Sequence, residues 1–200
     1  MKRIVLGSSS PRRQEMLRGL GIPFTVRTPN VDEENVLIIN PIEKVETLAK
    51  LKANNISLQS EDEVIVTADT IVAYQGTIFE KPKDKEEAYQ MITTLSGTTH
   101  EVITAVALRS TEKEEVFSVT TKVKFWDLTE EEIKAYIKTE EPYDKAGAYG
   151  IQDRAGTFVK KINGDYYNVV GLPVASLLRK LRKFDFNANK YIFSTEQDEL

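Results

Sequence analysis

Apolar residues follow two different spacings along the chain, and these spacings predict its strands and helices. A short apolar run at residues 4–6 predicts a buried strand. Apolar residues three and four positions apart predict two amphipathic helices, which begin at Pro11 and Pro41. The segment 63–74 is rich in β-branched residues and predicts the clearest strand of the chain.

Predicted strands and helices are also interleaved along the rest of the chain. Further strands are predicted at 22–28, 77–82, 100–110 and 114–127, and a strand pair at 156–162 and 166–171 that turns at Asn163-Gly164. Further helices are predicted at 84–97, 130–139 and 172–184. The side chains expected to cap helix starts are Ser10, Asp84 with Glu87, and Thr129 with Glu132.

Strands and helices that are interleaved along a chain favour an α/β architecture. The 200 residues contain no repeat, low-complexity tract or long linker. We therefore expect one domain over residues 1–184, with two lobes about a cleft, and a polar C-terminal tail over 185–200.

Charge and composition narrow the classes of function. The formal net charge is -4, so binding to nucleic acid or to an anionic membrane surface is not expected, and any bound anion needs a local cluster of basic groups. The chain has no cysteine, which excludes disulfides, zinc–thiolate sites and thiol nucleophiles. No apolar stretch is long enough to cross a membrane, and the N-terminus does not resemble a signal peptide. These features fit a cytoplasmic protein.

The segment GSSSPRR at residues 7–13 follows the first strand and leads into the first helix. Free backbone N–H groups and the helix dipole make such a loop a site for anions. Ser8, Ser9 and Ser10 would add hydroxyl donors, and Arg12 and Arg13 would add forked cationic donors suited to phosphate. A serine-rich turn with two solvated arginines explains the same pattern equally well. Neither GxxxxGK[ST] nor GxGxxG is present.

Two charged residues stand among apolar neighbours. Lys52 shares a helix face with Val45 and Leu48, so it either extends along the edge of that face into solvent or reaches into a cavity for an anion. Asp69 lies in VIVTADTIVAY, where a buried carboxylate is costly unless it is paired or binds a metal. It is either a structural aspartate bonded to nearby amides or a metal ligand or general base.

Further charged residues extend this chemistry. Asp32, Glu33 and Glu34 form an acidic loop that is either a solvated face or a source of oxygen ligands for Mg²⁺. Lys81 follows the predicted hairpin after the Asp69 strand. Carboxylates for a hard metal together with lysines and arginines suit polyphosphate chemistry.

Six separated motifs resemble those of the Maf family, the septum-formation-inhibitor homologues described as nucleoside triphosphate pyrophosphatases. They are SSSPRR, VDE, LAxxKA, ADTIV, EKP and YGIQD, in this order. The resemblance implies an elongated, curved mixed β-sheet flanked by helices, with two lobes around a cleft, similar to the inosine triphosphate pyrophosphatases. One residue departs from the pattern: Gly7 stands where alanine is more usual.

The resemblance also implies roles for individual residues. Asp69 is then the proton acceptor, and Glu33 with Asp69 are the ligands of a divalent cation, Mg²⁺ or Mn²⁺. The implied phosphate contacts are Ser8, Arg13, Lys52 and Lys81. The positions implied in base selectivity are Arg12, Thr70 and Gln152, and the AYGIQD stretch resembles the branch that prefers dTTP and UTP.

The implied reaction is metal-dependent hydrolysis of dTTP and UTP, and of CTP and modified pyrimidine nucleotides as further substrates, to the nucleoside monophosphate and pyrophosphate. House-cleaning and septum-inhibition roles follow from the resemblance, as do a homodimer and a cell-division partner. The alternative is a regulatory module in which nucleotide binding controls a division partner and turnover is incidental. An Asp69 that turnover needs but the division phenotype does not would favour that alternative.

Overall fold

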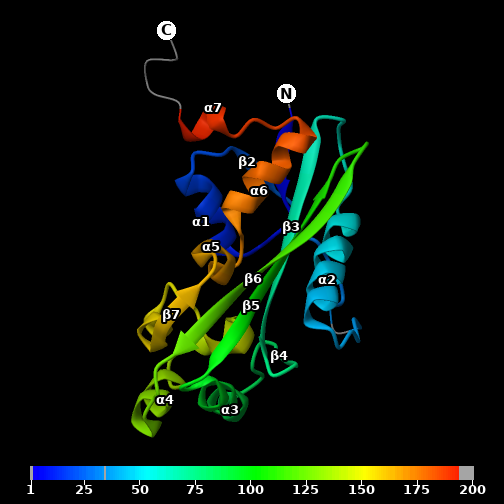
Figure 1. Cartoon of the computed structure of the whole chain (residues 1–200). Coiled ribbons are helices and arrows are strands. Elements are labelled where there is room, and N and C mark those ends of the chain that lie inside the picture. Colours follow the sequence, from blue (N-terminus) through cyan, green and yellow to red (C-terminus); the bar gives the residue numbers. More distant parts are fainter. Residues whose placement is uncertain (1, 34, 194–200) are drawn as a thin grey trace.

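The structure is a computed structural model that describes residues 2–33 and 35–193, and within them one mixed sheet runs the length of the molecule (Figure 1). Its strands are β1 (Arg3–Leu6), β2 (Phe24–Val26), β3 (Glu63–Tyr74), β4 (Thr77–Phe79), β5 (Thr99–Arg109), β6 (Glu114–Phe125) and β7 (Val159–Asn163). The strand order is β2-β1-β3-β5-β6-β7, with β4 also paired to β3. β1, β2 and β3 are parallel, whereas β3, β5, β6 and β7 form an antiparallel series. This mixed α/β sheet confirms the predicted fold class.

Helices cover both faces of the sheet (Figure 1). They are α1 (Pro11–Gly19), α2 (Pro41–Asn55), α3 (Lys85–Leu95), α4 (Glu130–Tyr136), α5 (Tyr166–Val170), α6 (Val174–Leu181) and α7 (Asn189–Ile192), with 3₁₀ turns at Glu141–Asp144, Ala146–Ala148, Arg154–Phe158 and Arg182–Phe184. α2 packs on β3 and β5 on one face. On the other face, α1 and α6 lie at one end and α3 and α4 at the other, each pair over its own apolar cluster.

The longest predicted elements agree with the structure because their patterns are unambiguous. α2 spans Pro41–Asn55 and buries Val45, Leu48 and Ala49, and Asn40 caps it by accepting from the Glu43 N–H. β3 spans Glu63–Tyr74 and is buried along almost its whole length, as expected for a strand that is covered on both faces.

The second half of the predicted strand pair is wrong, because residues 166–170 form helix α5. The Asp165 side chain accepts from the Tyr167 N–H and begins the helix, and Gly171, at φ 119°, ends it. Asn168 on α5 is fully buried and donates from its amide nitrogen to the Val102 carbonyl at 3.0 Å. A buried amide with a partner on β5 can be placed by a helix lying across the sheet, and this tertiary contact outweighs local strand propensity.

The predicted caps formed to different extents. Thr129 and Glu132 make a complete capping box at α4. Asp84 accepts from the Glu87 N–H, but the Glu87 carboxylate accepts from Lys83 instead of Asp84, so this box is incomplete. Ser10 occupies the cap position of α1 without a side-chain cap.

Part of the predicted polar tail packs on the protein. Phe186 and Ala188 are buried in the cluster beneath α1 and α6, and Tyr191 of α7 stacks on Phe186. Residues 194–200 lie outside the described part of the chain. In that described part, no helix is both long and apolar enough to cross a membrane.

Candidate active site

A cleft of about 940 Å³ opens along one edge of β3. On that edge β3 pairs with β1 up to Val66 and with β4 from Val72. Residues 67–71 of β3 therefore have no strand partner on this edge within the described part of the chain. The opposite edge pairs continuously with β5 from Ile65 to Ala73, which keeps the strand extended. Side chains from both faces of β3 therefore reach the same cleft at the gap, beside the carboxyl end of the parallel strand β1. Open α/β sheets place their ligand sites at such ends.

The residues predicted from the sequence meet at this cleft. Its lining includes Ser8, Arg12, Arg13, Glu33, Lys52, Asp69, Thr70, Lys81 and Gln152. Lys81 and Gln152 are exposed, whereas Ser8, Lys52 and Asp69 are buried. The acidic loop is represented by Asp32 and Glu33, because Glu34 lies outside the described residues. The role of each residue stays a prediction.

Two carboxylates converge on one buried ammonium. The Lys52 Nζ lies 2.5 Å from Asp69 Oδ1 and 3.0 Å from Glu33 Oε1. Lys52 comes from α2 and Asp69 from the face of β3 that α2 covers, where Thr67 also donates to the Ala49 carbonyl at 2.7 Å. The Lys52 side chain is 11% exposed, so it does not extend into solvent along the helix edge. Of the two sequence interpretations of Lys52, the structure favours the one that turns it into a cavity.

Arg13 occupies the opposite face of the same gap. Its guanidinium donates to the Gly171 carbonyl at 2.8 Å, to Thr70 Oγ1 at 3.1 Å and to Ser8 Oγ at 3.3 Å. Burial lowers the pKa of Arg13, and the nearby Asp69 charge opposes that effect. Three neutral oxygens thus hold the fork in one orientation, while the remaining N–H groups of the two terminal nitrogens can serve an anion.

A chain of hydroxyl groups behind Arg13 has a defined direction. Thr104 Oγ1 donates to the Asn168 carbonyl at 2.9 Å, so its proton is committed. Thr104 must therefore accept the 2.9 Å hydrogen bond that it shares with Thr70, and Thr70 in turn accepts from Arg13. Sequence reasoning missed Thr104 and Asn168, because neither stands out in a β-branched strand or in a segment interpreted as a strand.

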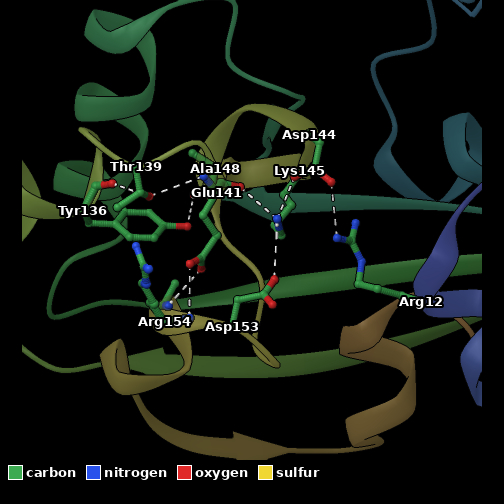
Figure 2. A network of polar contacts seen from close by, with 10 residues as sticks. Arg12, Tyr136, Thr139, Glu141, Asp144, Lys145, Ala148, Asp153 and Arg154 are labelled. Atoms are coloured by element: carbon green, nitrogen blue, oxygen red, sulfur yellow. Dashed lines mark hydrogen bonds and ion pairs between the residues drawn. The ribbon is translucent and has the colours of Figure 1, made fainter.

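Arg12 and Gln152, two of the three predicted selectivity residues, line the cleft beside the Glu141–Asp144 turn and the loop that follows it, whereas Thr70 lies at the gap beside Arg13. Arg12 Nη1 lies 3.4 Å from Asp144 Oδ2, which connects the start of α1 to the Glu141–Asp144 turn (Figure 2). Gln152 lies in the following loop and borders the cleft with Tyr149. The Tyr149 hydroxyl is 2.7 Å from Nε2 of the buried His100, and burial lowers the pKa of His100 to about 4.

The donor set fits a divalent cation that is shared with a phosphate ligand. Among the described residues, no group of three or more histidines and carboxylates could hold a metal ion by itself. Glu33 and Asp69, however, converge on one point that is now served by a cation, the Lys52 ammonium. Mg²⁺ is commonly bound by one or two carboxylates with substrate phosphates and waters as its other ligands. Glu33 and Asp69 are the residues that would hold it.

Comparison with known proteins gives matches over most of the chain. The family model described as Maf-like protein matches residues 3–184. A dTTP/UTP pyrophosphatase of Bacillus cytotoxicus is 49% identical over 189 residues, which cover 94% of this chain and 99% of that protein. A dTTP/UTP pyrophosphatase of Carboxydothermus hydrogenoformans is 50% identical over 186 residues, which cover 92% of this chain and 100% of that protein.

The fold has a more distant solved counterpart. The Ham1 protein of Staphylococcus aureus superposes with a TM-score of 0.52 at 13% identity, covering 92% of this chain and 100% of that chain. This likeness supports the fold alone.

Proposed function

Because this chain belongs to the Maf-like protein family, we propose that it is a nucleoside triphosphate pyrophosphatase that hydrolyses dTTP and UTP to the nucleoside monophosphate and pyrophosphate. The observation that carries the proposal is the convergence of the Asp69 and Glu33 carboxylates on the Lys52 ammonium. Arg13, whose guanidinium is fixed by a hydrogen bond to the Gly171 carbonyl, lines the same cleft. A buried carboxylate beside fixed cations suits a group that accepts a proton from water while a polyanion is bound.

In this proposal, Asp69 accepts a proton from the attacking water while the water oxygen forms a bond to the α-phosphorus. The bond from that phosphorus to the bridging α–β oxygen breaks, and pyrophosphate leaves. Arg13, Lys52 and Lys81 neutralise the phosphate oxygens, and the Ser8 hydroxyl and the backbone N–H groups in the first turn of α1 after Pro11 add donors. A divalent cation, when bound, would supply further neutralisation of phosphate charge.

The Lys52 ammonium is proposed to have two successive partners, first the Asp69 carboxylate and then the substrate phosphate. Asp69 and Lys52 are both largely buried, so each would be costly without the other. When Lys52 turns to a phosphate oxygen, one Asp69 oxygen is released from the ion pair. Substrate binding thus frees the carboxylate that accepts the proton.

Base selectivity is proposed to reside at Arg12, Thr70 and Gln152. Arg12 and Gln152 provide donors, and Gln152 and Thr70 provide acceptors, which together match the carbonyls and ring N–H of uracil and thymine. Cytosine has an acceptor in place of that ring donor, so a protein group is left unpaired and kcat/KM for CTP is lower than for UTP. CTP is therefore proposed as a slower substrate, and modified pyrimidine nucleotides are proposed as further substrates.

The wider expectations remain part of the proposal. A house-cleaning role would follow from removal of unwanted pyrimidine triphosphates in the cytoplasm. A septum-inhibition role, a cell-division partner and a homodimer stay predictions from the family resemblance.

The direct test combines a substrate panel with one variant. We expect pyrophosphate, and not orthophosphate, from dTTP and UTP with Mg²⁺ or Mn²⁺, and a loss of at least about 10²-fold in kcat for Asp69→Asn. Glu101→Gln is the matched control, because this half-buried carboxylate lies on the adjacent β5 outside the cleft lining. Near-normal turnover by a folded Asp69→Asn protein, or release of orthophosphate alone, would refute the proposal.

A further inference from the structure

We propose that Lys145 is a positioning residue that sets base selectivity without touching the base. Lys145 lies between Asp144, which is bonded to Arg12, and Asp153, which follows Gln152 in the chain (Figure 2). The inference rests on the proposed nucleotide hydrolysis, and it adds a residue to which the six sequence motifs gave no role.

Lys145 is the centre of a network of oxygen acceptors. Its Nζ donates to the Glu141 carbonyl at 2.8 Å and to Asp144 Oδ1 at 2.6 Å, and it forms an ion pair with Asp153 Oδ2 at 3.5 Å. The Lys145 side chain is 8% exposed, whereas those of Asp144 and Asp153 are 65% and 42% exposed. One buried ammonium thus holds two carboxylates that solvent would otherwise leave free to move.

The path of the Lys145 side chain depends on Gly150. A Cβ at Gly150 would lie 2.7 Å from Lys145 Cε and 2.8 Å from Asp153 Oδ2. The absence of a side chain therefore lets the lysine stem run directly against the loop that precedes Gln152. Packing and charge together fix the lysine to this loop.

Each of the two carboxylates that Lys145 binds is connected to one residue predicted to contact the base. Asp144 is bonded through its other oxygen to Arg12 Nη1 at 3.4 Å, across the cleft from the Glu141–Asp144 turn. Asp153 directly follows Gln152 in the chain. The same loop is held from its other side by the Glu141 carboxylate, which accepts from the Ala155 N–H at 3.1 Å. Lys145 therefore couples the placement of Arg12 to that of Gln152.

This coupling predicts a selectivity defect and not a general one. Without the ammonium, Asp144 and Asp153 are two like charges with no shared partner. The loop that carries Gln152 and the Arg12 guanidinium are then no longer fixed relative to each other. A base whose edge matched both groups then loses about one net hydrogen bond, which corresponds to roughly five- to tenfold in the UTP/CTP ratio of kcat/KM. Phosphate contacts and proton transfer lie elsewhere in the cleft and are retained.

The test uses Lys145→Met, which keeps a long unbranched stem against Gly150 and removes the charge. We expect the UTP/CTP ratio to fall about five- to tenfold, mainly through a higher KM for UTP, and Lys145→Arg to restore part of it. Lys180→Met is the matched control, because Lys180 pairs with Glu115 at 2.5 Å outside the cleft lining. It should leave the ratio unchanged.

A second variant guards against misfolding of Lys145→Met. Asp153→Asn removes an exposed partner and should lower the ratio in the same direction. An unchanged ratio in both variants, or an equal loss for UTP and CTP, would overturn the inference while the hydrolase function stands. A wild-type protein that hydrolyses UTP and CTP equally well would overturn this inference together with the proposed base selectivity. A wild-type protein that releases no pyrophosphate from either nucleotide would overturn the proposed function itself.

Discussion

Acidification should destabilise the protein through its single histidine. His100 is 1% exposed, and burial lowers its pKa from the ordinary value near 6.5 to about 4. Below pH 6.5 the unfolded chain therefore binds a proton that the folded protein does not, so stability is lost as the pH falls from about 6.5 towards 4. At pH 5 this difference lowers the free energy of unfolding by about 2 kcal/mol relative to pH 7.

The structure explains why protonation is unfavourable there. Nε2 of His100 already lies 2.7 Å from the Tyr149 hydroxyl, and the ring packs edge-on against Phe125 at 4.9 Å between centroids. Nδ1 is buried and has no hydrogen-bond partner among residues 2–33 and 35–193, so a charged ring would leave a donor unsatisfied. Only the neutral ring suits this position.

Urea denaturation at pH 7, 6 and 5 would measure the effect, with His100→Gln as the reference. Glutamine keeps polar groups near Tyr149 but does not titrate, and the chain has no second histidine. The two proteins share the titration of their carboxylates, so the difference between their pH slopes isolates His100. Equal slopes for both proteins between pH 7 and 5 would refute the buried neutral histidine.

Three further results are expected. Thr104→Val should leave the Thr70 hydroxyl proton without its acceptor and remove one of the two hydrogen bonds to the Asn168 carbonyl, which keeps the one from the Gly171 N–H. The resulting loosening of Arg13 should lower kcat/KM by about tenfold and the unfolding free energy by about 1–3 kcal/mol, and unchanged kinetics would show that the hydroxyl chain does not orient Arg13. Gly7→Ala should cost about 1–3 kcal/mol, because its Cβ would lie 2.4 Å from Ile56 Cδ1, and Ile56→Val should recover part of that loss in a double-mutant denaturation series. Chelation of divalent cations should abolish pyrophosphate release, and Mg²⁺ or Mn²⁺ should restore it; full turnover in excess chelator would contradict the assignment of a metal to Glu33 and Asp69.

The Gly7 prediction also accounts for the one departure from the family motif. The space that an alanine methyl would take at this position is filled by Ile56, at the end of α2, and by the Thr67 Cγ2 at 2.5 Å. The strand-to-loop junction is thus closed by a neighbouring side chain and not by the residue itself.

Several features were determined by the sequence because their signals are local. The period of apolar residues in 41–55 and the β-branched run in 63–74 define α2 and β3, and the Thr129–Glu132 pattern defines the start of α4. The chemistry of Asp69 and Lys52 was also visible, since a charge in an apolar pattern requires a partner. Their pairing with each other was not, because 17 residues separate them and only the packing of α2 on β3 brings them together.

Tertiary structure decided the features that depend on which segments meet. The gap between β1 and β4 along β3 allows Asp69 and Thr70, which point to opposite faces, to reach one cleft, and strand pairing over long separations cannot be read from spacing. Residues 166–170 became a helix because burial of Asn168 against β5 and β6 outweighs the hairpin signal at Asn163-Gly164. Lys145 appeared to be an ordinary polar residue of a loop, and only the folded chain surrounds its ammonium with three oxygens from separate positions.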